Sequence, residues 1–212
     1  MRAVALVLAL CASCSGLTVE PDPGSGPLLG ENNPAFHGRL RELAAGYESY
    51  ARVDDELHWA PELCRMPTPS YPRRSASVHV ETHGQKLYYL FAKDREAYLG
   101  RSGKTPAVVG QVVVKEAWEV EEVPAATTYD VSKSPVRYLR ENGRLFHAQK
   151  KSGMFIMYRL DPATPDTDHG WVYGTVAPDG QTVTSAGRVS SCMGCHQQAP
   201  NERLFGINYH GA

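Results

Sequence analysis

The chain has 212 residues, of which 42% are hydrophobic and 21% are charged, the balance of an ordinary globular protein. Its 22 basic and 23 acidic residues give a formal net charge of −1, which excludes the strong positive bias of nucleic-acid-binding proteins, so we expect no nucleic-acid partner. Beyond the first segment no apolar run reaches about 18 residues, and we therefore expect no membrane-spanning helix. The length suits one domain that can bury a core.

The first segment has the layout of a secretory signal. A Met-Arg start precedes an apolar run over residues 3–10, and small residues follow where cleavage would fall. We expect residues 1–16 to be a signal peptide and the protein to be exported to the periplasm. Cys14 follows Ala-Ser, as in a bacterial lipoprotein, although Cys11 stands where leucine is usual. A lipid anchor at Cys14 and simple cleavage are both open.

Residues 17–36 are rich in proline and glycine and predict a flexible linker to a domain over residues 37–212. Within that domain, leucine, alanine and tyrosine recur at helical spacing over residues 38–53, which predicts a helix. Prolines between residues 61 and 72 then exclude regular structure from that stretch.

Beyond these prolines the hydrophobic pattern alternates, which is typical of β-strands. The predicted strands cover residues 77–81, 86–92, 110–120, 146–160, 171–176 and 181–184. A short helix capped by Asp94 is predicted over residues 94–99, and Ala-Pro-Asp-Gly at residues 177–180 predicts a hairpin turn.

A cysteine and histidine motif lies close to the C-terminus. Residues 192–196 read Cys-Met-Gly-Cys-His, which is the attachment pattern of c-type haem. Cys192 and Cys195 would each form a thioether with a haem vinyl group, and His196 would bind the iron as its proximal ligand. We expect a short helix beginning at residue 190 or 191 to carry the motif. The sequence therefore predicts one covalent haem c; a redox disulfide and half of a zinc site are the alternatives.

The position of this motif sets the chain apart from small helical cytochromes, which carry the motif near the N-terminus. Here several predicted strands precede it. We expect an α+β domain in which an antiparallel β-sheet forms one wall of the haem pocket and a few helices lie to one side. Cys64 is the remaining cysteine, and it is either a buried free thiol or a residue with a role beside the haem.

Lys115 interrupts the strongest predicted strand. By strand alternation it shares one face of the sheet with Val113 and Ala117, whereas Glu116 shares the other face with Val112 and its neighbours of the same parity. One of the two charges must therefore lie on a largely apolar face or at its rim. The pattern alone favours an exposed lysine on the outer face of the sheet.

Taken together, the signal, the Val-Val-Val-Lys-Glu strand at residues 112–116 and the late haem motif resemble the cytochrome P-460 and cytochrome c′-beta superfamily, over roughly residues 87–205. The resemblance implies a β-rich, periplasmic c-type haem protein that is usually a homodimer. In the cytochrome P-460 branch, a lysine of that strand is cross-linked to a haem meso carbon and the enzyme oxidises hydroxylamine; Lys115 falls on that position. Proteins of the c′-beta branch lack the cross-link and bind nitric oxide or carbon monoxide.

The resemblance also implies that the distal side of the haem separates the two branches, because the enzymes carry a carboxylate there that helps to move protons. The corresponding strand, residues 154–160, contains no acid, and Asp161 just follows it. The candidates for the distal pocket are Phe91, Met157 and Tyr158. The candidates for a sixth iron ligand, as in electron-transfer cytochromes, are Met66, Met154 and Met157.

Two functions follow from these observations. The first is a haem-dependent oxidoreductase that acts on hydroxylamine or a related nitrogen oxide, with Lys115 as its cross-link. The second is a non-catalytic protein that carries electrons or binds a diatomic gas. Both require a redox partner protein or a small ligand, and neither involves nucleic acid.

Overall fold

The computed structural model describes residues 31–53, 71–74, 86–100, 103, 105–131 and 135–206. The expected signal peptide at residues 1–16, most of the expected linker, Cys64, Met66 and the predicted strand at residues 77–81 lie outside the described residues. None of the described helices is long and apolar enough to cross a membrane.

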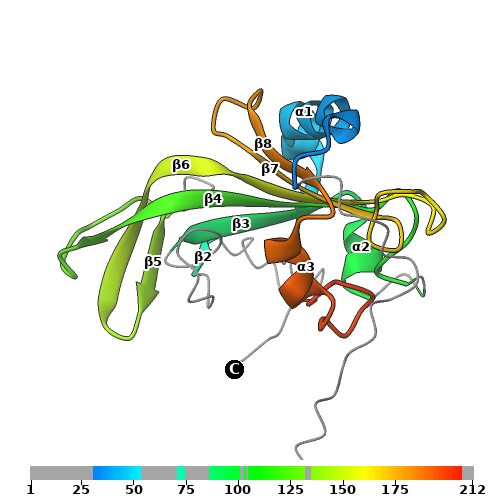
Figure 1. Cartoon of the computed structure of the whole chain (residues 1–212). Helices are drawn as coiled ribbons and strands as arrows, with labels where there is room; N and C mark the ends of the chain where they lie inside the picture. The colour runs from blue at the N-terminus through cyan, green and yellow to red at the C-terminus, as the bar shows by residue number, and fades with distance from the viewer. Residues whose placement is uncertain are drawn as a thin grey trace, which may run out of the picture.

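Across these residues the chain forms an eight-stranded antiparallel sheet (Figure 1). The main path of the sheet is β1 (Ala51–Arg52), β3 (Leu87–Ala92), β4 (Val112–Val123), β6 (Arg144–Arg159), β7 (Trp171–Val176) and β8 (Val183–Gly187). Two short strands complete it, β2 (Arg73–Arg74) beside β3 and β5 (Tyr138–Glu141) beside β6.

Helices cover both faces of this sheet. α1 (His37–Gly46), with the 3₁₀ turns η1 (Pro34–Phe36) and η2 (Tyr47–Ser49) at its ends, packs on one face. α2 (Arg95–Tyr98) and α3 (Ser190–His196) lie on the other face, so that α1 and α3 stand on opposite sides of the sheet in Figure 1. We refer to these two sides as the α1 face and the α3 face. The architecture is mainly antiparallel β-sheet with few helices, which confirms the α+β prediction. The expectation that the helices lie to one side of the sheet is wrong, because both faces carry apolar side chains that helices cover.

Strand alternation divides the core into two clusters. On the α1 face, Val112 and Val114 of β4 pack with Leu40 and Leu43 of α1. On the α3 face, Val113 of β4 packs instead with residues such as Met157, Trp171 and Met193. α1 approaches the sheet closely at Gly174 of β7, where an added Cβ atom would lie 2.5 Å from a methyl group of Leu40.

Two local predictions are confirmed by hydrogen bonds. Asp94 is the N-cap of α2, and its carboxylate accepts a hydrogen bond from the backbone N–H of Ala97 at 2.9 Å. In the hairpin turn between β7 and β8, the N–H of Gly180 donates to the carbonyl of Ala177 at 3.0 Å, and Gly180 has a φ of +71°. α3 begins at Ser190, as expected.

The first helix and the linker depart from their predicted bounds. The helix predicted over residues 38–53 ends at Gly46, and the chain turns through η2 so that Ala51 and Arg52 pair with β3. Glycine is a poor residue for continuing a helix, and the pairing with β3 then fixes the extended backbone. The end of the expected linker belongs to the fold, because the N–H of Asn33 donates to the carbonyl of Ala186 in β8 at 2.9 Å.

Candidate functional site

His196, the last residue of α3, is held by one hydrogen bond and two aromatic rings. Its Nδ1 atom lies 2.7 Å from the backbone carbonyl oxygen of Arg203. A carbonyl only accepts hydrogen bonds, so Nδ1 carries the proton and Nε2 keeps its lone pair. This is the tautomer that a histidine needs to bind a metal through Nε2. The ring centre lies 5.6 Å from that of Tyr173 and 5.2 Å from that of Phe205.

The electrostatic surroundings keep this imidazole neutral. Burial is the main cause that lowers the pKa of His196, and the positive charge of Lys115 lowers it further. The hydrogen bond to Arg203 acts in the opposite direction but does not reverse the shift. A neutral imidazole is the form that binds iron.

Cys192 and Cys195 are free thiols on the same short helix, one half-buried and one exposed. Their separation of three residues places both on one side of α3. Burial is the main cause that raises the pKa of Cys192 to about 11, so this group is a thiol rather than a thiolate. A thioether to a vinyl group forms when S–H adds across the C=C bond, which needs no oxidant. Among the described residues, no group of three or more His, Cys, Asp or Glu side chains could hold a metal ion, so the zinc alternative finds no ligands there.

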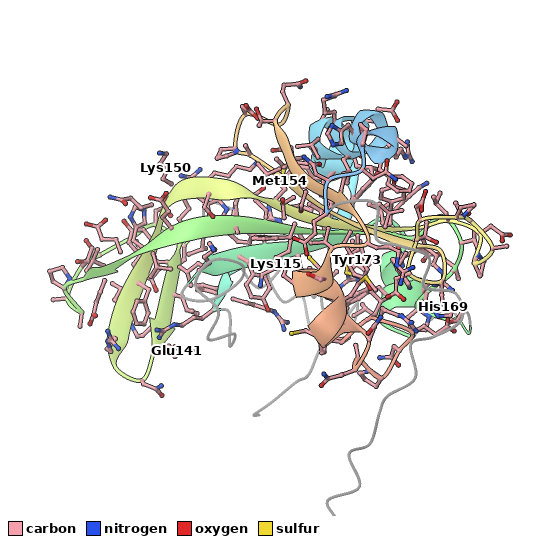
Figure 2. All side chains as sticks on the ribbon, viewed as in Figure 1. Lys115, Glu141, Lys150, Met154, His169 and Tyr173 are labelled. Atoms are coloured by element: carbon pink, nitrogen blue, oxygen red, sulfur yellow. The ribbon has the colours of Figure 1, made fainter. Side chains whose placement is uncertain are left out.

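Lys115 lies on the α3 face of β4, where Figure 2 shows it on the same side of the sheet as Tyr173 and α3. Its register partners are Leu90 of β3 and Phe155 of β6. Its Nζ atom lies 4.1 Å from the centre of the Tyr88 ring. The side chain is half-buried, which corrects the exposed position that the pattern alone favoured: the α3 face is partly covered at this point.

Burial is the main cause that lowers the pKa of Lys115 to about 8, and the charge of Lys86 adds to it. The neighbouring charge, Glu116, points to the α1 face as alternation predicted, and it is 7% exposed. There it accepts hydrogen bonds from Trp118 Nε1 at 2.6 Å and from the hydroxyl of Tyr47. The acid is therefore part of the core, whereas the amine stands on the same face as His196.

The structure brings only one of the three candidate distal residues to this face. Met157 belongs to the α3-face cluster. Phe91 packs on Tyr47 with ring centres 4.9 Å apart, and Tyr158 packs on Phe36 at 6.5 Å, both on the α1 face. Phe91 and Tyr158 therefore do not share a pocket with Lys115 and His196, because their parity in β3 and β6 is that of Val114 and Val112.

Met154 is also on the α1 face, 2% exposed, so it cannot reach an iron bound by His196 (Figure 2). The residues that do flank Lys115, Leu90 and Phe155, were missed. The signal that could have found them is the antiparallel register of β4 with β3 and β6, which pairs each of them with Lys115.

The α3 face can accept a haem. Leu90 and Phe155 beside Lys115 are only half-buried, so apolar sheet surface remains for a flat, apolar ring to cover. Next to them, two small residues pair across the strands, Ala117 of β4 with Gly153 of β6, and both are buried. The two thiols, the oriented imidazole and this apolar surface are the groups of the α3 face that would hold a porphyrin.

These features are those of a haem protein in which a Cys-x-x-Cys-His motif follows a β-sheet. More specifically, the chain belongs to the cytochrome P460 family: the family model described as Cytochrome P460 matches residues 70–205, a range that holds Lys115, Cys192, Cys195 and His196. The match confirms the resemblance seen in the sequence. No curated protein sequence matches the chain.

Proposed function

We propose that the protein is an exported c-type haem protein that acts in redox chemistry on small nitrogen oxides such as hydroxylamine. Cys192 and Cys195 hold one haem covalently, and His196 binds its iron through Nε2. The observation that carries the proposal is the position of Lys115, a half-buried amine on the same face as His196 and close enough to shift its pKa. Burying an amine among apolar side chains costs free energy, and titratable groups perturbed in this way are concentrated at functional sites.

Lys115 serves in this proposal as a cross-link to a haem meso carbon. One C–H bond of the haem and one N–H bond of the amine are lost, and one C–N bond forms. Two protons and two electrons leave, so the step requires a two-electron oxidant such as a peroxide. The neutral amine is the nucleophile, and a pKa of about 8 makes it accessible near neutral pH.

When bound, the haem supplies an iron atom that exchanges electrons with the substrate. The chain's own contribution is to orient His196, to cover one side of the ring with apolar side chains and to limit water at the α3 face. Each electron removed from hydroxylamine leaves an N–H or O–H proton to be transferred. The electrons pass to a redox partner protein.

One observation favours a second function, a non-catalytic c′-beta-like protein that binds nitric oxide or carbon monoxide or carries electrons. The part of β6 that faces the α3 side near Lys115 presents Phe155 and Met157, which are both apolar, and no acid. A diatomic ligand needs no proton acceptor, so the apolar character of this part of β6 is compatible with such a ligand.

The optical spectrum of the matured protein separates the two functions. We expect covalent haem that survives a denaturing gel and a strongly red-shifted Soret band, which is the mark of the cross-linked haem. Lys115→Ala should restore an ordinary c-type Soret band. Lys150→Ala, which removes the same charge from an exposed position of β6, should leave the red shift unchanged. An ordinary Soret band in the wild type, with rapid carbon monoxide binding to the ferrous form, would support the second function.

Export and lipidation are tested on the same preparation. We expect mass spectrometry of the mature protein to show that the first residues have been removed. A lipid mass on Cys14 and release from membranes in Cys14→Ala would establish the anchor, whereas an unmodified new N-terminus would establish simple cleavage. Elution volume in gel filtration tests the homodimer that the family resemblance implies.

A further inference from the structure

A strained turn follows α3. The backbones of Asn201 and Leu204 exchange two hydrogen bonds, of 3.2 and 3.1 Å. Between them, Glu202 has a φ of +49° and Arg203 a φ of +77°. Two consecutive left-handed residues form the kind of tight turn in which glycine and asparagine are usual. Residues with a side chain keep this backbone only where their surroundings hold it.

The side chain of Arg203 is held by Asp168. Its Nη2 and Nε atoms donate to the two carboxylate oxygens of Asp168 at 2.9 and 3.0 Å. Asp168 is only 3% exposed and also accepts a hydrogen bond from the hydroxyl of Tyr173 at 2.8 Å. A buried, two-point ion pair of this kind fixes a guanidinium in position as well as in orientation.

Glu202 is held independently. Its backbone carbonyl accepts a hydrogen bond from Trp171 Nε1 at 2.9 Å. Its carboxylate lies 3.4 Å from Nη2 of Arg159 and accepts a hydrogen bond from the hydroxyl of Thr105 at 3.3 Å. The turn is thus anchored through both of its central residues to β6, β7 and the loop before β7.

The anchored turn places one backbone carbonyl against His196. The carbonyl of Arg203 is the acceptor for Nδ1–H of His196, at 2.7 Å. Tyr173 connects the same groups a second time, since its hydroxyl donates to Asp168 and its ring lies beside His196. Backbone strain, a buried ion pair and an aromatic contact therefore converge on the orientation of one imidazole.

We infer that Asp168 is a positioning residue for the axial ligand of the haem iron, and that it acts through Arg203. By holding the Arg203 side chain, it fixes the Arg203 carbonyl on Nδ1–H of His196. A firm hydrogen bond at Nδ1 makes the imidazole a stronger electron donor to iron and stabilises the ferric state. This inference rests on the proposed role of His196 as the iron ligand.

The test uses the haem-loaded protein and two variants that break the ion pair. Asp168→Asn keeps the shape and an acceptor for Tyr173 but removes the charge, and Arg203→Gln removes the guanidinium. The readouts are the midpoint potential of the haem and the iron–histidine stretching band of the ferrous protein in resonance Raman spectra. We expect each variant to have a more positive potential and a band at lower frequency than the wild type.

The double variant shows whether Asp168 acts through Arg203. If it does, Asp168→Asn/Arg203→Gln should shift the potential by the same amount as either single change. Additive shifts would overturn that route. Arg144→Gln, which breaks the exposed ion pair with Glu122 far from α3, is the matched control and should move neither readout.

Arg203 is partly exposed, so Arg203→Gln remains a fair test if Asp168→Asn does not fold. A lower melting temperature with unchanged potential and unchanged Raman band would show a purely structural ion pair and would sink the inference. That outcome differs from failure of the proposed function, in which the wild-type protein itself would carry no covalent haem on a stained denaturing gel.

Discussion

Lys115 and Glu116 are neighbours in the sequence but lie on opposite faces of the sheet. Glu116 is enclosed on the α1 face by Trp118, by Tyr47 and by Lys151, whose Nζ lies 3.7 Å from the carboxylate. These donors satisfy a buried charge that would otherwise be strongly destabilising. Lys115 lies instead on the α3 face, where burial and the charge of Lys86 disfavour its charged form although its Nζ atom contacts the ring of Tyr88. The acid is part of the core, and the amine is the group that the proposed cross-link would use.

The rate of cross-link formation should therefore depend on pH. The pKa of Lys115 is lowered to about 8, so raising the pH through that value removes the proton and exposes the lone pair that reacts. We expect the initial rate of the Soret red shift, after peroxide is added to haem-loaded protein that is not yet cross-linked, to rise with a midpoint near that pKa. An ordinary lysine would give a midpoint near about 10.4. A rate that does not change from about pH 6 to about pH 10 would contradict a role for the free amine.

The helix α1 packs closely on β7 because position 174 of that strand is a glycine. Gly174 lets Leu40 of α1 touch the strand, and Leu40 is fully buried there. We expect Gly174→Ala to lower the free energy of unfolding by about 1–3 kcal/mol through overpacking, and Leu40→Ala to lower it by about 2–5 kcal/mol through the cavity it leaves. The two together should lower it by less than the sum, because removing the methyl groups makes room for the new Cβ.

Chemical denaturation of the haem-loaded variants measures these effects. Gly46→Ala is the matched control, since an added Cβ atom there meets nothing within 4 Å. Strictly additive losses for Gly174→Ala and Leu40→Ala would show that the two positions do not share one packing site. The Soret band should be unchanged in all of these variants, because both positions lie on the α1 face.

At the scale of elements, the sequence predicted those features that local chemistry determines. Asp94 caps α2, glycine turns the β7–β8 hairpin, and the period-two pattern around Lys115 correctly placed Lys115 and Glu116 on opposite faces of β4. It could not predict β1, because Ala51 and Arg52 become a strand only by pairing with β3. Such pairing is set by tertiary contacts and leaves no local signal.

The sequence predicted some residues of the candidate site and missed others. The haem motif follows from residue type and spacing, whereas Lys115 was singled out by the family resemblance, because the pattern alone favoured an exposed lysine. Phe91 and Tyr158 were assigned to the wrong side of the sheet, because a shift of one residue along a strand reverses the face. Nothing in the sequence indicated the ion pair of Asp168 and Arg203. Glu202 and Arg203 are unusual residues for a left-handed turn, and Asp168 lies in a loop that is distant in the sequence.

In the whole molecule, the two faces of the sheet carry different groups: one carries most of the hydrophobic core and the other carries the candidate site. The α1 face carries the larger hydrophobic core, with α1 and the N-terminal residues that pair with β8. The α3 face carries the thiols, the imidazole and the amine, which come from β4 and from the last helix of the chain. A site divided between distant segments is complete only once the sheet has formed, since β6, β7 and β8 lie between β4 and α3 along the sheet path.

That division has a consequence for the topology of the chain. Lys115 and Cys192 are 77 positions apart, and a haem bonded to both would close the chain between them into a covalent ring. A ring of this size restricts the unfolded state, and in the chain-entropy description of such links it stabilises the native fold by about 4 kcal/mol. We expect the cross-linked wild-type protein to unfold at a higher denaturant concentration than the haem-loaded wild-type protein that has not formed the cross-link. Equal midpoints for the two forms would mean that the lysine bond changes the iron alone and leaves the chain as easily unfolded as before.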